Sequence, residues 1–206
     1  MTHLYLIRHA DYIYDLVDGQ YPRRDQGLSP EGVLQAERLR DRFARSGELK
    51  PDVFISSPER GAHETAQIIA PVLGQPIILD KEVEEWRSED GSLNDEEFFT
   101  RWEAVPDAQK PYYRWVEGCE NLREFSLRVH LGLNRILQDY DGKTIVILTH
   151  GAYIQVTFSY FFGYGEASSQ WATAEIRRTS ITHWYKNTGQ KRWTLERSND
   201  CQHCAP

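Results

Sequence analysis

The stretch Leu4-Tyr5-Leu6-Ile7-Arg8-His9 places four apolar side chains directly before two basic ones. A second stretch, Ile145-Val146-Ile147-Leu148-Thr149-His150, repeats the pattern of an apolar run that ends in polar residues. A continuous short apolar run is typical of a strand that is covered on both faces, as in a parallel sheet. Both stretches therefore predict buried strands, and two further runs, 53–55 and 77–79, predict the same.

Amphipathic segments that predict helices lie between these runs. Ser29 followed by Pro30 and Glu31 is a typical helix start, because serine caps the first amides, proline fits the first helical position and an acid favours the positive end. We expect this helix to end at Gly47 and to bury three apolar side chains, Leu34, Leu39 and Phe43.

The later part of the chain continues the alternation of helices and strands. A second helix is expected from Ser57-Pro58-Glu59 to Gly74, a third near residues 122–137, and a fourth after His150. Two strand-like segments around Thr188-Gly189 predict a hairpin. The sequence therefore predicts an α/β fold with three α/β/α layers, in which a mostly parallel central sheet carries an antiparallel edge hairpin.

Residues 82–117 interrupt this rhythm with many aromatic side chains among acids. Such a segment is too aromatic for a solvated linker. We interpret it as a cap insertion packed over one end of the sheet, within a single domain that spans residues 1–206. We expect these aromatic side chains to pack against one another and the core rather than to stack on a ligand.

Composition narrows the class of protein. The 206 residues carry 24 basic and 31 acidic side chains, for a net charge of −7, so a nucleic-acid partner is not expected. A mean hydropathy of −0.62 argues against a membrane partner. Without a secretory leader in its first residues, the chain is expected in the cytoplasm. Its six tryptophans fit a core or an interface, which leaves the oligomeric state open, a homodimer included.

The three cysteines are an odd number in a chain of this size, which argues against a disulfide framework. Cys201-Gln202-His203-Cys204 looks like half of a metal site, but a second cysteine pair is missing. We expect a frayed end to the chain there and no metal site.

Polar clusters follow three of the predicted strands: Arg8-His9, the segment 56–60, and Thr149-His150-Gly151. Because parallel strands bring their carboxyl ends to one edge, two histidines and two arginines are expected to meet. A phosphoryl group suits this cluster, since guanidinium groups and helix amides bind its oxygens and a neutral imidazole can attack its phosphorus.

Three segments carry a resemblance to a known family: Ile7-Arg8-His9-Ala10, Ser56-Ser57-Pro58 with Arg60 and Thr65-Ala66, and Thr149-His150-Gly151. In order and spacing, the chain resembles the histidine phosphatase superfamily, in its phosphoglycerate mutase-like branch. The resemblance implies a phosphatase that hydrolyses a small phosphate monoester through a phosphohistidine on His9. It also implies that Arg8, Arg60 and His150 complete the phosphate pocket, and that no metal or organic cofactor is needed.

The resemblance further implies a carboxyl group that protonates the leaving oxygen. The family spacing matches Glu85, and Glu84 is its neighbouring rival. Such an acid must keep its proton near neutral pH, so we expect Glu85 to lie against apolar groups such as Trp86, which raises its pKa.

Several residues are candidates for substrate binding near this pocket, and Trp86, next to Glu85, is one of them. Ser57 could bond phosphate or cap a helix, His63 could reach the pocket rim, and Gly151 begins the helix after the second histidine. Asp15 stands where the family commonly has asparagine, and its charge would repel phosphate unless Arg23 or Arg24 neutralises it.

Three rival functions stay open. A mutase-like phosphotransferase shares the pocket, although the double-arginine segment of the glycolytic mutases is missing. A catalytically weak phosphate-binding module would explain Asp15. A metallohydrolase would rest on His9-Ala10-Asp11, without a second cluster of ligands.

Overall fold

The computed structural model describes residues 1–13, 25–88, 90, 92–93, 95–163 and 172–204. Within these residues the strands are β1 (Thr2–Arg8), β2 (Val53–Ser56), β3 (Ile77–Leu79), β4 (Thr144–Thr149), β5 (Ile181–Lys186) and β6 (Thr194–Asp200). The helices are α1 (Pro30–Ser46), α2 (Arg60–Leu73), α3 (Asp95–Ala104), α4 (Leu122–Asp139) and α5 (Gly151–Phe162), with two 3-10 helices, η1 (Lys81–Val83) and η2 (Asp107–Tyr112).

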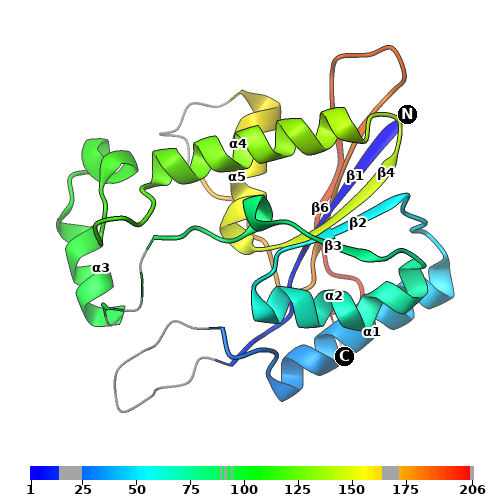
Figure 1. The fold of residues 1–206 in the computed structure, drawn as a ribbon, viewed down its shortest axis with the longest axis horizontal. Coiled ribbons are helices and arrows are strands. Elements are labelled where there is room, and N and C mark those ends of the chain that lie inside the picture. Colours follow the sequence, from blue (N-terminus) through cyan, green and yellow to red (C-terminus); the bar gives the residue numbers. More distant parts are fainter. Residues whose placement is uncertain (14–24, 89, 91, 94, 164–171, 205–206) are drawn as a thin grey trace.

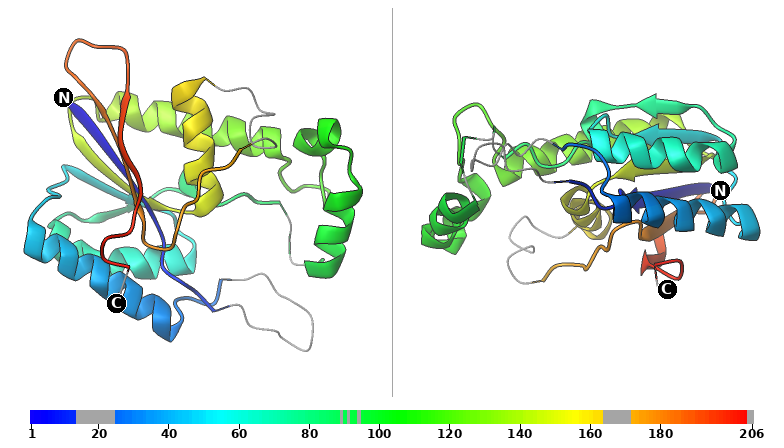
Figure 2. Two further views of the ribbon diagram at one scale, coloured as in Figure 1. Left: turned by 180° about the vertical axis from the view of Figure 1, so that it is seen from behind. Right: turned by 90° about the horizontal axis from the view of Figure 1, so that it is seen from below.

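The described strands form one six-stranded sheet in the order β3-β2-β4-β1-β5-β6. The pairs β3/β2, β2/β4 and β4/β1 are parallel, and the hairpin β5–β6 is antiparallel to β1 and closes one edge. Helices α4 and α5 cover one face, and α1 and α2 cover the other (Figures 1 and 2). The predicted α/β/α layers with an antiparallel edge hairpin are confirmed.

The apolar runs of the strands supply a core on each face of the sheet. Alternate side chains of β1 point to opposite faces, so Leu4 and Leu6 join one cluster whereas Tyr5 and Ile7 join the other. On the first face they meet α4 through Phe125, Val129, Leu133 and Ile136, and on the second they meet α1 and α2 through Leu39, Phe43, Ala66 and Ile69.

Three local predictions are wrong, each for a physical reason. Leu34 is 47% exposed, because the buried stripe of α1 runs through Gly32, Ala36, Leu39 and Phe43. Strand β3 is an edge strand, so Ile78 and Leu79 are exposed. The segment 201–204 packs on the fold and is not frayed, since His203 is buried and its Nε2 lies 3.1 Å from Oγ1 of Thr179.

The aromatic segment extends beyond the sheet. Helices α3 and η2 lie beside the first turns of α4 rather than over the strands (Figures 1 and 2). Trp86 connects this segment to the core. The centre of its ring lies 5.1 Å from that of Trp115 in the aromatic segment and 6.1 Å from that of Phe125 in the core. Aromatic packing therefore anchors this segment.

Candidate active site

The carboxyl ends of β1, β2 and β4 meet at one edge of the sheet. Two backbone hydrogen bonds continue the pairing past the strands: the amide of His9 donates to Thr149 O at 2.9 Å, and that of Ser57 donates to Leu148 O at 2.9 Å. The rings of His9 and His150 consequently lie 4.8 Å apart, centre to centre. The two imidazoles that the sequence places far apart do meet.

His9 is buried and presents one nitrogen to the site. Its Nδ1 lies 2.7 Å from the carbonyl oxygen of Ala10, which can only accept, so Nδ1 carries the proton and Nε2 carries the lone pair. Burial, together with the neighbouring His150 and Arg178, holds the pKa of His9 well below its ordinary value. The ring is therefore neutral near pH 7, with a nucleophilic nitrogen free of a proton.

His150 lies next to Ser57. Its Nε2 is 2.8 Å from the Ser57 oxygen, which also accepts from the amide of Glu59 at 3.2 Å. Burial and the charge of Arg8 lower the pKa of His150 to about 3. The expected cap on α2 is wrong in detail: the N-cap residue is Glu59, because Ser57 bonds the Glu59 amide and faces the site.

Arg8 crosses the start of α5. Its Nη1 donates to Ile176 O at 2.5 Å, and a methyl group on Gly151 would lie 3.3 Å from the guanidinium carbon. That distance is shorter than an ordinary van der Waals contact, so glycine lets the guanidinium lie against the helix. This places the Arg8 charge close enough to His150 to lower its pKa.

Glu85 occupies the amino end of α5. Its two carboxylate oxygens accept from the amides of Ala152 at 3.0 Å and Tyr153 at 3.1 Å. Burial raises the pKa of Glu85, and the backbone donors oppose that shift. Glu84 instead pairs with Arg87, Oε2 to Nη2 2.7 Å. The geometry supports Glu85 over Glu84 as the carboxyl group of the site.

Two further residues belong to the site and were missed from the sequence. Glu59 accepts from the amide of Glu85 at 3.0 Å, and its second oxygen is 3.7 Å from His150 Nε2. Burial and the nearby charges of Glu85 and Glu84 raise the pKa of Glu59 to about 7. The sequence places Glu59 in the polar cluster 56–60 and at the start of a helix, and neither observation assigns it a role in the site.

Arg178 is the second missed residue. Its Nη1 lies 3.1 Å from His9 Nε2. A signal existed, because β5 runs antiparallel to β1, so the residues just before β5 lie beside the carboxyl end of β1; the Arg8 amide donates to Ser180 O at 3.2 Å. The expected hairpin therefore implied that residues near 178 reach the same edge.

The other candidates lie elsewhere or outside the described residues. Arg60 pairs with Glu64, Nε to Oε1 2.8 Å, with 62% of its side chain exposed, and His63 is half-buried beside Glu64. The roles assigned to these residues and to Trp86 stay predictions. Asp15, Arg23 and Arg24 fall outside the described residues.

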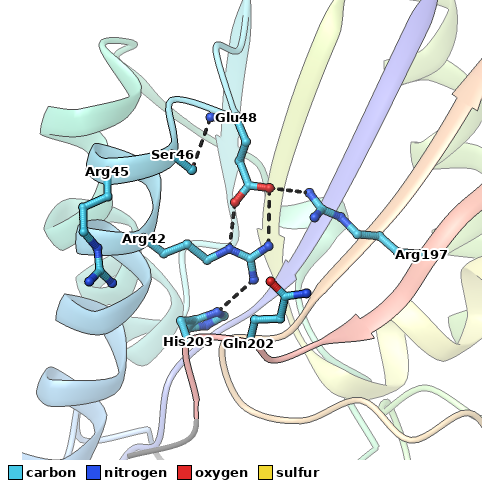
Figure 3. Close-up of a pocket in the computed structure, with 7 residues that line it drawn as sticks. All are labelled: Arg42, Arg45, Ser46, Glu48, Arg197, Gln202 and His203. Atoms are coloured by element: carbon cyan, nitrogen blue, oxygen red, sulfur yellow. Dashed lines mark hydrogen bonds and ion pairs between the residues drawn. The ribbon is translucent and has the colours of Figure 1, made fainter.

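A separate cavity of about 430 Å³ opens at the opposite end of α1 (Figure 3). Its charged walls are already paired: Arg42 binds Glu48 and Asp200, and Arg197 binds Glu48. We find no group of three or more His, Cys, Asp or Glu side chains that could hold a metal ion in the described part of the chain. None of the described helices is both long and apolar enough to span a membrane.

Comparison with known proteins identifies the family. The family model of the histidine phosphatase superfamily (branch 1) matches residues 4–201. The 5''-phosphoribostamycin phosphatase of Niallia circulans is 29% identical, with 97% of each chain covered. The probable phosphoglycerate mutase GpmB of Salmonella paratyphi C is 27% identical and covers 98% of this chain and 95% of its own. The solved structure of Bacillus stearothermophilus YhfR aligns over 100% of both chains with a TM-score of 0.78 at 23% identity.

The chain thus belongs to the histidine phosphatase superfamily, as its three motifs predicted. It is an enzyme of the phosphoric monoester hydrolase class within that superfamily, and that prediction is confirmed.

Proposed function

We propose that this protein hydrolyses a small phosphate monoester without a metal ion, through a phosphohistidine formed on Nε2 of His9. One observation carries the proposal: the neutral His9 ring keeps the lone pair on Nε2, beside the ring of His150 and against the guanidinium group of Arg178. Attack of that lone pair on phosphorus breaks the bond to the ester oxygen. Water then cleaves the P–N bond and releases inorganic phosphate.

The cations and donors of the site support the transfer. The Arg8 charge lies close enough to lower the pKa of both His9 and His150, and the Ser57 hydroxyl contacts Nε2 of His150 while its oxygen accepts from the amide of Glu59. Donors that tighten on the equatorial oxygens of the transition state accelerate the displacement. Arg60 stays proposed for the pocket, and it would have to leave Glu64 to act there.

Glu85 is the proposed general acid and then base. Its raised pKa favours a carboxyl group that still holds a proton in weakly acidic solution. It would give that proton to the departing alcohol oxygen and afterwards take one from the attacking water. The adjacent Glu59, with a pKa of about 7, keeps a second neutral carboxyl beside it below that pH.

A comparison of leaving groups tests these roles. We expect Glu85→Gln to lower kcat on an alkyl phosphate about 100-fold or more, and to lower it far less on p-nitrophenyl phosphate, whose phenolate departs without a proton. Glu84→Gln is the matched control and should leave both rates near wild type. Equal losses on the two esters would remove Glu85 from the acid role.

The covalent step is tested by quenching. Rapid-quench labelling should trap acid-labile phosphate on the wild-type protein and none on His9→Ala. A full label on His9→Ala would rule His9 out as the nucleophile. Turnover should persist in EDTA and stop with orthovanadate, whereas loss of activity on chelation would favour the metallohydrolase.

The similarity to a phosphoglycerate mutase keeps a phosphotransferase as the second candidate. Passage of the label from the phosphohistidine to an added alcohol, in place of its release as inorganic phosphate, would favour transfer over hydrolysis. A protein that binds phosphate but never forms the labelled intermediate would be the weak binding module. The cytoplasm stays the proposed location, which the free thiols of Cys201 and Cys204 support.

A further inference from the structure

The guanidinium group of Arg178 is held among three residues of the β1 end. Besides its contact with His9 Nε2 at 3.1 Å, its carbon lies 4.9 Å from the ring centre of Tyr12, and its Nε is 3.8 Å from Asp11 Oδ1. About a quarter of the side chain is exposed. The group is therefore fixed over the nucleophile and still reaches solvent.

The backbone that carries Arg178 is clamped. Thr179, a β-branched residue, has φ of 57°, a left-handed conformation that such residues adopt rarely. Its amide donates to Arg8 O at 3.0 Å, and its hydroxyl contacts Nε2 of His203 at 3.1 Å. A strained conformation of this kind persists only where its surroundings hold it. It fixes where the preceding residue, Arg178, can place its side chain.

The charges around Arg178 favour binding of its guanidinium group to a phosphate. The nitrogen of His9 that Arg178 covers is neutral, and Oδ1 of Asp11 lies 3.8 Å from Nε of Arg178, beyond hydrogen-bond distance. A guanidinium group binds a phosphate dianion more strongly than a neutral imidazole, because both partners are then charged and two parallel hydrogen bonds form. Exchange of His9 for phosphate is thus favourable for Arg178.

We propose that Arg178 is a phosphate-binding residue that also covers the resting nucleophile. In the free protein its Nη1 donates to His9 Nε2. When a phosphoryl group enters, the guanidinium group moves onto its oxygens, and the lone pair of His9 becomes free to attack. This inference rests on the proposed function and adds to Arg8 and Arg60 a third arginine, which lies outside the three sequence motifs.

Binding of inorganic phosphate to the resting protein tests the proposal without turnover. We expect Arg178→Met to weaken phosphate binding, measured by calorimetry, about 30-fold, the loss of charge-assisted hydrogen bonds. Arg178→Lys should recover part of that affinity, because lysine keeps the charge and loses the planar fork. Arg177→Met is the matched control, since Arg177 is 60% exposed and pairs with Glu175; its affinity should stay within about twofold of wild type.

Two results would overturn the inference. The first is an unchanged phosphate affinity in folded Arg178→Met. The second is a loss of phosphate affinity in Arg60→Met alone, since that result would assign phosphate binding to Arg60. If circular dichroism shows that Arg178→Met does not fold, the phosphate affinity of Arg178→Lys is measured in its place. Wild-type affinity in Arg178→Lys would show that phosphate binding does not depend on the planar guanidinium group, and would overturn the inference. A wild-type protein that binds phosphate through Arg178 but turns over no ester would defeat the proposed function and leave this inference intact.

Discussion

Burial moves the acids and the imidazoles of the site in opposite directions on the pH scale, and in each case toward the neutral form. The pKa of Glu85 is raised and that of Glu59 reaches about 7, whereas the pKa of His9 is lowered and that of His150 falls to about 3. Desolvation disfavours a charge of either sign, which explains both. Near neutral pH the arginines therefore supply the charge that attracts phosphate.

Glu59 should set the alkaline limb of activity. Below its pKa of about 7 its carboxyl is neutral, and above it an anion appears 3.7 Å from His150 and next to Glu85. That anion repels a phosphate dianion, so we expect kcat/KM to fall above about pH 7. Glu59→Gln removes the anion, and its kcat/KM measured from pH 5 to 9 should lose this limb. An unaltered limb in the variant would assign it to another group.

The sequence could predict which segments meet, and it could not predict which arginine turns inward. His9 and His150 follow apolar runs, so the strand pattern alone placed them together. Arg60 and Arg178 each border the same edge, but the side chain of the first extends to Glu64 and that of the second to His9. The difference lies in local backbone angles, such as the positive φ of Thr179, which residue spacing does not encode.

At the scale of elements, the start of α1 is linked to the site. Ser29 accepts from the Gly32 amide at 2.9 Å and donates to Asp11 Oδ2 at 2.7 Å, and the other oxygen of Asp11 faces Arg178. The cap of α4 has no such link: Asn121 and Glu124 form a reciprocal capping box. One helix cap thus orients a carboxylate of the site, and the other only begins its helix.

Alanine at the two caps should separate these roles. Both Ser29→Ala and Asn121→Ala should lower the free energy of unfolding by about 1 kcal/mol, as measured by urea denaturation. We expect only Ser29→Ala to weaken phosphate binding as well, since it frees Asp11 beside Arg178. Equal phosphate affinity in the two variants would show that Asp11 needs no support from the cap.

Helix ends show how far local sequence determines an element. Gly47 and Gly74 end α1 and α2 with positive φ, as predicted, because glycine adopts that conformation at little cost. The start of α2 differs from its prediction because a tertiary contact, Ser57 with His150, outweighs the capping preference of serine. Local sequence therefore determines a helix end where no residue distant in the chain bonds the capping side chain.

Across the whole molecule, buried neutral histidines make the fold sensitive to acid. The pKa of His183 and that of His203 are both lowered to about 4 by burial, against 6.5 for a free histidine. Below pH 6.5 the unfolded chain takes up these protons first, so stability falls from there toward the folded pKa. The acids with raised pKa act with the opposite sign and offset part of the loss.

His183→Gln isolates this effect, since His183 lies on β5 against His3 and Tyr5, away from the pocket. Between pH 6.5 and 5, urea denaturation of the variant should show about 1 kcal/mol less loss of unfolding free energy than wild type, since one proton gives at most about 1.4 kcal/mol per pH unit and solvent screens part of it. Parallel curves for the two proteins would contradict a neutral, buried His183.

Glu85 closes the open amides of α5 with the same two oxygens that the proposed reaction protonates and deprotonates. A proton on one oxygen weakens the hydrogen bond that this oxygen accepts from the amide of Ala152 or Tyr153, so the first turn of α5 is held less tightly while Glu85 is protonated and more tightly after the proton has left with the alcohol. The same protonation equilibrium of Glu85 therefore governs both the proposed reaction and the stability of the first turn of α5. Any change that stiffens the beginning of α5 would also alter how readily the enzyme gives up its proton.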